Sequence, residues 1–388
     1  MTLIDDGTPG FGVYVHWPFC AAKCPYCDFN SHVRHSPVDQ EAFVKSYLAE
    51  IKAVYALTGP RQVTSVFFGG GTPSLMAPET LDAILQAIDQ AWGLPAGIEI
   101  SMEANPASSD AERFKAYAMA GVNRASLGVQ ALNDDDLRFL GRLHTVDEAL
   151  RAIDLARSSF GRMSFDLIYA RPGQTAAQWE AELRRAIGYA ADHLSLYQLT
   201  IEDGTPFKSL HETGQLVLPD DDLAADLYAL TQSVTAELGL PVYEISNHAA
   251  PGARSRHNLT YWRYGDYAGI GPGAHGRLTL ENGAKIATVA KRHPESWADL
   301  VGQQGQGMTT QTMLTTREQA DEMLVMGLRL TEGFDLARFE TLAGRPIADE
   351  KLQAMIDLGM VVRLGNARIA ATDKGRIVLN AVLAELAL

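Results

Sequence analysis

Short apolar runs alternate with amphipathic stretches along the chain from residue 11 to about residue 200. The runs are rich in β-branched and aromatic residues, as buried strands are, and the stretches between them have the apolar spacing of helices. The predicted strands are residues 12–17, 63–68, 98–103, 123–129, 163–169 and 193–200. The predicted helices between them are residues 39–57, 78–92, 110–120, 146–158 and 175–189.

These strand–helix units predict an α/β fold with a parallel sheet and right-handed crossovers. The strands are apolar over most of their length, as is expected where helices cover one face of the sheet. Six units are too few for a closed eight-stranded barrel, so we expect an open, partial (β/α)6 barrel over residues 1–200. Ligands of such folds bind at the carboxyl ends of the strands.

The rest of the chain divides into three predicted parts. Residues 201–300 combine a helix over 221–238, a strand over 242–246 and glycine-rich loops, which indicates an α+β extension. A run rich in glutamine and glycine then predicts a linker over residues 301–312. Residues 313–388 follow as an independent C-terminal domain.

The C-terminal domain is predicted to have a winged-helix-like order of elements. Helices are expected over 317–329, 336–342 and 348–358, and strands over 360–364 and 367–370. The two strands flank Gly365 and Asn366, a typical two-residue hairpin turn. Thr372 and Asp373 then cap a last helix.

Charge excludes one class of partner. The 388 residues include 33 Lys and Arg against 47 Asp and Glu, a formal net charge of −14. Within residues 313–388 the balance is 9 against 11, or −2. Because nucleic-acid binding needs a basic face, we expect no nucleic-acid partner, and we expect the C-terminal domain to pack against the barrel.

The start of the chain and its cysteines indicate the compartment. Residues 1–7 are acidic and lack the apolar run of a secretory signal, and no stretch approaches the roughly 18 apolar residues of a membrane span. The three cysteines lie close together and are odd in number, which excludes a disulfide framework. We therefore expect a cytoplasmic protein with no membrane span.

Cys20, Cys24 and Cys27 lie in a loop directly after the first predicted strand. Three thiolates from one short loop are able to bind three irons of a 4Fe-4S cluster and leave the fourth iron open. Structural zinc is the alternative, with a fourth ligand from His16, His32 or His35. The position of the loop at the mouth of a barrel strand favours iron–sulfur.

Residues 14–20 (YVHWPFC) and 24–29 (CPYCDF) resemble the radical S-adenosylmethionine superfamily. This resemblance implies that the three cysteines bind a 4Fe-4S cluster whose open iron is chelated by the amino and carboxylate groups of S-adenosyl-L-methionine. It also implies that Tyr26 leans on the adenine of that ligand.

Polar or glycine residues also end the later predicted strands. The carboxylate of Glu103, at the end of the third strand, would accept hydrogen bonds from ribose hydroxyls, and Arg142 would pair with the methionine carboxylate. Glycines at the end of the second strand let the backbone approach a small ligand closely. The resemblance implies that S-adenosylmethionine is bound by Tyr14, Gly70, Gly71, Thr72, Glu103, Gln130, Arg142 and Asp166.

Four further segments resemble the oxygen-independent coproporphyrinogen III oxidase group. They are residues 166–169 (DLIY), 172–175 (PGQT), 202–207 (EDGTPF) and 269–275 (GIGPGAH). The group contains a dehydrogenase branch and a branch of HemW-type heme chaperones, and the resemblance covers nearly the whole chain.

Two features favour the heme chaperone branch. Phe29 stands where the dehydrogenase has a fourth cysteine, and residues 257–262 (HNLTYW) match the His-Asn-x-x-Tyr-Trp signature of the chaperones. The resemblance implies that His257 binds heme iron, because neutral imidazole is a common axial ligand. One departure is Arg171, next to Pro172, where relatives have leucine; we expect it to pair with a heme propionate or with Asp166.

The expected function is therefore to bind heme and to transfer it to an acceptor protein, for example a membrane-associated respiratory protein. The alternative is oxygen-independent coproporphyrinogen III dehydrogenation, in which a deoxyadenosyl radical abstracts hydrogen from the substrate propionates. Radical modification of tRNA is a third class, and the net charge of −14 argues against it.

Overall fold

The computed structural model describes residues 7–365 and 367–387, and one mixed sheet of 11 strands forms its centre. Its strand order is β13-β12-β11-β10-β1-β4-β5-β6-β7-β8-β9. The six strands predicted for the barrel are neighbours in this sheet and run parallel. They are β1 (Phe11–Trp17), β4 (Val63–Gly70), β5 (Glu99–Ala104), β6 (Arg124–Gln130), β7 (Arg162–Tyr169) and β8 (His193–Gln198). The predicted α/β fold is confirmed.

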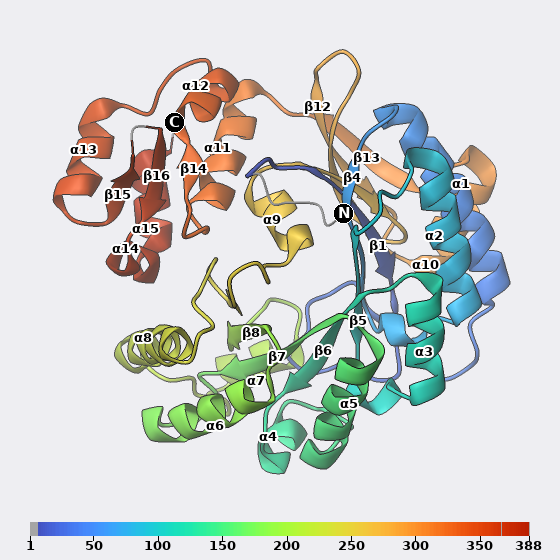
Figure 1. The fold of residues 1–388 in the computed structure, drawn as a ribbon, viewed down its shortest axis with the longest axis horizontal. Helices are drawn as coiled ribbons and strands as arrows, with labels where there is room; N and C mark the ends of the chain where they lie inside the picture. Colours follow the sequence, from blue (N-terminus) through green and yellow to red (C-terminus); the bar gives the residue numbers. More distant parts are fainter. Residues whose placement is uncertain (1–6, 366, 388) are drawn as a thin grey trace.

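Helices follow the outer side of this curved sheet (Figure 1). They are α1 (Gln40–Thr58), α2 (Pro78–Trp92), α3 (Ala111–Ala120), α4 (Asp134–Phe139), α5 (Val146–Ser159) and α6 (Ala176–Tyr189). Local sequence sets their starts, because Thr145 and Thr175 each form a capping box with the residue three positions on. Apolar side chains from the helices and the sheet form one large core.

The extension adds strands to the other edge of the same sheet. β10 (Asp266–Ile270) pairs in parallel with β1, and antiparallel strands continue from it. The remaining elements of this part are β9 (Asn247–Ala249), β11 (His275–Thr279), β12 (Lys285–Ala290), β13 (Met308–Met313), α7 (Pro206–Glu212), α8 (Asp221–Glu237), α9 (Arg256–Trp262) and α10 (Pro294–Gln304). The predicted strand over 242–246 is wrong, since only Val242 bridges there, to His248.

The predicted linker over residues 301–312 is also wrong. The segment holds the end of α10 and most of β13, which forms the outer edge of the sheet. Of its glycines, Gly307 is required for close packing, because a Cβ there would lie 2.1 Å from the Trp297 ring. Glycine content alone therefore did not distinguish a tightly packed turn from a mobile connection.

The buried Glu50 of α1 connects three segments near this edge of the sheet through hydrogen bonds. Its carboxylate accepts hydrogen bonds from the backbone N–H of Gly271 (2.6 Å), the backbone N–H of Gly307 (2.9 Å) and the indole N–H of Trp297 (3.0 Å). Burial raises the pKa of Glu50 to about 7. The loop that precedes β11 is thereby fixed to α1.

We expect Glu50→Gln to destabilise the protein by about 1–3 kcal/mol, because the amide turns an N–H₂ group toward N–H donors. Glu41→Gln on the same helix is the matched control, since Glu41 is exposed and pairs only with Lys45. Urea unfolding of both variants measures the difference. Equal midpoints for the two variants would contradict this role for Glu50.

The C-terminal domain has a core of its own and packs beside the barrel (Figure 1). Its elements are α11 (Thr316–Gly327), β14 (Phe334–Asp335), α12 (Leu336–Ala343), α13 (Asp349–Asp357), β15 (Val361–Leu364), β16 (Arg368–Ala371), α14 (Asp373–Ile377) and α15 (Leu379–Leu386). Strands β15 and β16 pair antiparallel, as predicted. Asn366 of the predicted turn lies outside the described residues, as do residues 1–6 of the acidic start.

Polar contacts fix this domain to the extension. Glu332 contacts the guanidinium groups of Arg254 (3.1 Å) and Arg263 (2.7 Å), which belong to the extension. Arg338 donates to the backbone carbonyl of Arg263.

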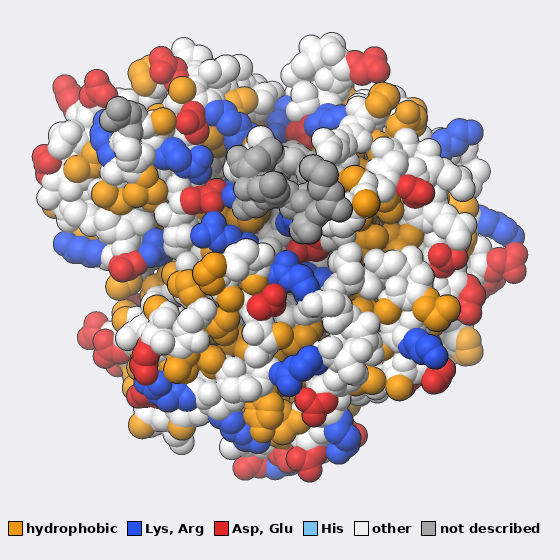
Figure 2. All heavy atoms as spheres, viewed as in Figure 1, with side chains coloured by type: hydrophobic (Ala, Val, Ile, Leu, Met, Phe, Trp, Pro, Cys, Tyr) orange, Lys and Arg blue, Asp and Glu red, His pale blue; other side chains and the backbone are white. Residues whose placement is uncertain are grey.

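On the face shown in Figure 2, acidic and basic side chains are interspersed and form no large patch of a single charge.

Candidate functional site

The three cysteines lie on one loop at the carboxyl ends of the parallel strands. Cys20 ends the short strand β2 (Phe19–Cys20), and Cys24 and Cys27 precede β3 (His32–Val33). Cys20 is buried and the other two are half-buried. Burial raises the pKa of the Cys20 and Cys27 thiols, and the neighbouring cysteines raise it further. The three thiols therefore lie within range of one another's charge, although among the described residues no group of three His, Cys, Asp or Glu side chains is positioned to hold a metal ion.

Two side chains from other parts of the chain hold the cysteine loop: Thr72, just after β4, and Arg142, between α4 and α5. The Thr72 hydroxyl donates a hydrogen bond to Sγ of Cys20 at 3.3 Å. The Arg142 guanidinium donates to Sγ of Cys24 at 3.3 Å and to the Gly128 carbonyl at 2.7 Å. Both residues were predicted to contact S-adenosylmethionine, and both also touch the thiols.

The glycine run after β4 packs directly under the cysteine loop. Gly71 donates its backbone N–H to the Trp17 carbonyl at 2.6 Å, and a Cβ on Gly71 would lie 2.7 Å from the Phe19 carbonyl oxygen. Gly70 has a φ of 114°, and its Cβ would lie 2.5 Å from the His16 ring. Only glycine fits at these two positions, as a close backbone approach requires.

Unpartnered polar atoms gather below this loop. Among the described residues, Oε1 of Gln130, Oδ1 of Asp166 and Nε of Arg142 are buried without a hydrogen-bond partner. Glu103 accepts a hydrogen bond from the Gly70 N–H at 3.0 Å. Buried polar atoms are nearly always paired in folded proteins, so these atoms indicate a polar ligand.

Two of these groups are carboxyls with raised pKa values. Burial raises the pKa of Glu103 to about 8, and the charge of Asp166 adds to the effect. Burial likewise raises the pKa of Asp166 to about 7. A cationic ligand with hydroxyl and carboxylate groups would satisfy both carboxyls and the unpartnered atoms. S-adenosylmethionine has this chemistry, so the residues present fit it.

Tyr26 lies within the cysteine loop, beside a small aromatic group. Its ring centroid is 6.3 Å from that of Phe207, and Phe207 is 5.0 Å from Phe139. Burial raises the pKa of the Tyr26 hydroxyl, and the Arg142 charge opposes this shift. Phe207 is the last residue of the EDGTPF motif, which was a signal for it, whereas nothing in the sequence marked Phe139.

His16, one of three candidate fourth ligands for zinc, is occupied by other contacts. Its Nδ1 lies 2.9 Å from the Tyr14 hydroxyl, and its Nε2 lies 2.9 Å from the Asn30 carbonyl oxygen. Both ring nitrogens are therefore engaged within the described residues. His32 has a contact of 3.3 Å from its Nε2 to Asn30.

A cavity of about 350 Å³ opens beside the cysteine loop. Its lining comes from the cysteine loop, the strand ends and the glycine-rich loop before β11: Tyr14, His16, Asp28, Phe29, Asn30, Gly70, Glu103, Gly273, His275 and Arg292. The predictions named Tyr14, Gly70 and Glu103 as binding residues but missed His275 and Arg292. The GIGPGAH motif was a signal for His275, whereas nothing marked Arg292.

His257 lies outside the lining of this cavity. It is 8% exposed on α9, and its ring stacks on Phe67, with a centroid distance of 4.4 Å, and on Tyr14, at 6.0 Å. Burial lowers the pKa of His257 to about 3, so the imidazole is neutral at physiological pH. Its Nδ1 is buried with no hydrogen-bond partner among the described residues.

Helix α9 is held in place by Glu99, at the start of β5. The Glu99 carboxylate accepts from the backbone N–H groups of Arg256 (2.9 Å) and His257 (3.2 Å), and Ser255 caps the helix. An acidic group at a helix N-terminus is stabilising. The sequence pattern did not predict this contact, because the two segments are 156 residues or more apart.

Arg171 does not pair with Asp166, in contrast to one of the two partners expected for it. Its buried guanidinium contacts Glu182 at 2.5 Å and Asp136 at 3.1 Å, and it donates to the Ile168 carbonyl. These carboxylates belong to α6 and α4, on the helical side of the strands. The contacts of Arg171 therefore connect the end of β7 to two helices and do not include Asp166.

Comparison with known proteins adds to this geometry. The model of the radical SAM superfamily matches residues 14–186, and the HemN C-terminal domain matches residues 314–378. The heme chaperone HemW of Escherichia coli is 37% identical, over 97% of this chain and 97% of its own. The chain belongs to the HemW-type family of radical SAM proteins.

Other relatives of this HemW-type chain include a mitochondrial protein. Radical S-adenosyl methionine domain-containing protein 1 of Bos taurus is 41% identical, over 84% of this chain and 75% of that protein. The solved structure of coproporphyrinogen III oxidase (HemN) from Escherichia coli superposes with a TM-score of 0.80, over 98% of this chain and 91% of that one, at 21% identity. This match shows that the two proteins share the fold.

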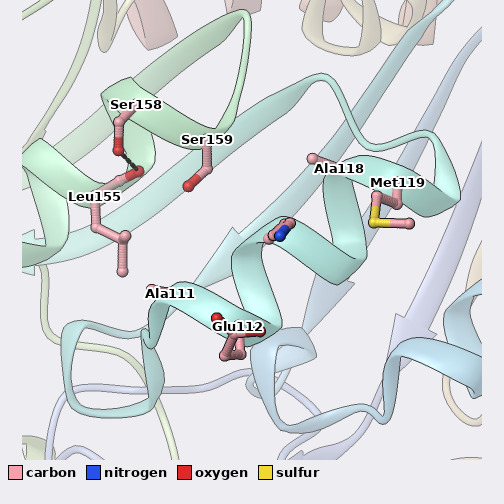
Figure 3. Close-up of a pocket in the computed structure, with 8 residues that line it drawn as sticks. Ala111, Glu112, Ala118, Met119, Leu155, Ser158 and Ser159 are labelled. Carbon is pink, nitrogen blue, oxygen red and sulfur yellow. Dashed lines mark hydrogen bonds between the residues drawn. The ribbon is translucent and has the colours of Figure 1, made fainter.

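A second hollow of the HemW-type chain lies between α3 and α5, with a volume of about 500 Å³ (Figure 3). Its lining combines apolar and hydroxyl side chains, such as Met119 and Ser159, with the charged side chains of Glu112 and Lys115. None of its lining residues has a buried unpartnered polar atom, in contrast to the strand ends.

Of the described helices, none has the length and apolar character that crossing a bilayer needs.

Proposed function

We propose that this protein is a cytoplasmic heme chaperone, which binds heme and passes it to an acceptor protein. The observation that carries the proposal is the similarity over 97% of the chain to a protein named heme chaperone HemW. The exposed ring of Phe29, at the position of the dehydrogenase's fourth cysteine, is consistent with this branch. A membrane-associated respiratory protein is one acceptor that fits the proposal.

In this proposal Cys20, Cys24 and Cys27 hold a 4Fe-4S cluster. S-adenosylmethionine lies on the strand ends, where Glu103 and Asp166 face its positive charge, with Gly70, Gly71, Gln130, Arg142, Thr72, Tyr14 and Tyr26 around it. When bound, the cluster would supply an electron and an open coordination position. Support comes from the unpartnered buried atoms of Gln130, Arg142 and Asp166.

Heme titration of the reconstituted full-length protein tests the function. We expect stoichiometric binding with a distinct Soret band, followed by loss of that band to an apo-heme protein supplied as acceptor. The alternative reaction is tested in parallel with coproporphyrinogen III, S-adenosylmethionine and a reductant. Robust formation of protoporphyrinogen IX would overturn the chaperone proposal in favour of the dehydrogenase.

His257 is the heme ligand that the family resemblance implies, and its neutral imidazole supports this part of the proposal. Ligation would require the stacked rings of Tyr14 and Phe67 to separate from it. The test compares His257→Ala with His248→Ala, which removes another buried imidazole, on β9. An altered Soret spectrum in the first variant alone supports His257, whereas an unchanged spectrum would remove it from the heme site.

S-adenosylmethionine binding should strengthen as the pH rises. Below pH 7 the raised pKa values keep Glu103 and Asp166 protonated, so binding a cation has to expel protons, and above pH 8 it does not. We expect the dissociation constant to fall about tenfold between pH 6.5 and pH 8.5. Equilibrium binding at the two pH values, with the cluster reconstituted, measures the change.

Glu103→Gln provides the control for this pH dependence, because the variant cannot ionise at that position. Any titration of the amino group of the ligand itself would remain in the variant, so the difference between the two proteins isolates the carboxyl. An identical slope in wild type and Glu103→Gln would contradict the assignment of Glu103 to this site.

A further inference from the structure

Three side chains at the mouth of the 350 Å³ cavity take no part in the cluster or S-adenosylmethionine sites. Phe29 is 57% exposed, although it is a large aromatic residue. His275 and Arg292 are also exposed, and neither side chain has a hydrogen bond or ion pair with another described residue. The mouth therefore presents an aromatic face, a free imidazole and a free guanidinium together.

The backbone beneath these side chains is tightly fixed. Asn30, next to Phe29, donates from Nδ2 to the carbonyls of Pro272 and Arg292, each at 2.9 Å. A Cβ on Gly273 would lie 2.2 Å from the same Nδ2. The cysteine loop, the segment before β11 and the segment before α10 thus meet at Asn30, which holds the three exposed side chains in one place.

The neighbouring glycines bring the strands equally close. A Cβ on Gly269 would lie 2.1 Å from the carbonyl oxygen of His275, and Gly271 is bonded to the buried Glu50. This explains why the GIGPGAH segment is rich in glycine: Gly269 lies against the backbone of His275 in β11, and Gly271 lies against His16 of β1 and Tyr47 of α1. His275, at the end of the segment, is its exposed member.

The positively charged side chains at the mouth differ in whether a carboxylate lies beside them. Arg34 and His293 both contact Glu295, so that carboxylate is shared by two partners. Arg292 has no such partner among the described residues, and Asp28 is the other charged residue of the outer lining. An anionic group of a ligand would therefore find one free guanidinium here.

We propose that this mouth is the docking site for heme, with Phe29 against the porphyrin face, His275 as an axial ligand of the iron and Arg292 bound to a propionate carboxylate. The inference rests on the proposed heme-binding function and assigns the accessible iron ligand to His275. His257 would reach the iron only after Tyr14 and Phe67 separate from its ring. Imidazole is a standard iron ligand, arginine binds carboxylates through paired hydrogen bonds, and an aromatic ring covers apolar surface.

The iron contact is tested with ferric heme and the full-length protein. We expect His275→Gly to weaken heme binding at least tenfold and to change the Soret spectrum, and free imidazole to restore the spectrum by entering the vacated position. His35→Gly is the matched control, because His35 is an exposed histidine just after β3 that does not line the cavity. A purely structural role for His275 would not respond to imidazole.

The propionate contact is tested with heme and heme dimethyl ester, which lacks the negative charges. Wild type should bind heme about tenfold more tightly than the ester, and Arg292→Gln should lose that preference while it binds the ester as well as wild type does. Phe29→Ser should weaken both ligands alike. These three patterns separate charge recognition from apolar contact.

The outcomes also separate this inference from the proposed function. If His275→Gly and Arg292→Gln bound heme with wild-type affinity, spectrum and ester preference, the docking site would be overturned and the chaperone function would stand. If the wild-type protein bound no heme at all, the proposed function itself would fail.

Discussion

Arg171→Met is expected to destabilise the protein by about 3–5 kcal/mol, because the substitution leaves the buried Glu182 carboxylate without its cation. Arg171 and Glu182 are 4% and 11% exposed in their side chains, with 2.5 Å between them. Glu182 also accepts from the Leu132 N–H at 2.7 Å, so it cannot turn toward solvent without breaking a second contact.

A matched pair of variants makes this expectation specific. Arg184→Ala removes an exposed pair with Glu237, and we expect a loss below about 1 kcal/mol. Arg171→Met combined with Glu182→Leu removes both buried charges, and we expect it to recover much of the lost stability. Urea unfolding of the three variants provides the measurement, and a loss for Arg171→Met no larger than that for Arg184→Ala would contradict the role of the pair.

For Arg171, the sequence predicted the position of the residue but not its partners. Its position after β7 was clear from the chain, and placement near a strand end suggested a ligand or Asp166 as partner. The structure pairs it with carboxylates on α4 and α6, because those helices pack against the same strand from the outer side. A one-dimensional pattern places a side chain on an element but does not say which neighbour covers it.

The parallel half of the fold was largely predictable, because each of its strands and helices has a strong local signal. Helix α2, for example, begins and ends at the predicted residues 78 and 92. The antiparallel edge was not predictable in the same way. Strand β13 is short, polar and glycine-flanked, and it is a strand because its neighbour β12 offers hydrogen bonds over five paired positions.

Some residues of the candidate site were likewise predictable from the sequence, and others were not. Cys20, Thr72 and Glu103 lie at or just after the carboxyl ends of strands, so topology alone brings them to one edge. Arg142 reaches the same edge from the loop between α4 and α5. Asn30 and Arg292 reach that edge from loops, and Phe207 from the first turn of α7, along paths that the sequence did not specify. His257 was found from its motif, but its burial behind Tyr14 follows from the packing of α9 on the inner face of β1 and β4.

Cys24→Ala is expected to abolish cluster binding and, with it, tight binding of S-adenosylmethionine. A cluster with one open iron already uses every thiolate that this chain offers, since its three cysteines all lie in the loop. Roughly four iron atoms per chain in the wild type should fall to near zero in the variant, after anaerobic reconstitution of both. Iron and acid-labile sulfide content, together with S-adenosylmethionine affinity, provide the measurements.

The variant should still fold, which makes this loss interpretable. Cys24 is half-buried, and its Sγ accepts a hydrogen bond from Arg142. Asp28→Ala is the matched control within the same loop, because it removes a charged side chain and leaves all three thiols. Equal iron and sulfide in wild type and Cys24→Ala would contradict the cluster assignment. Zinc without sulfide in the wild type would instead establish the alternative metal, and the open coordination position for S-adenosylmethionine would then have no basis.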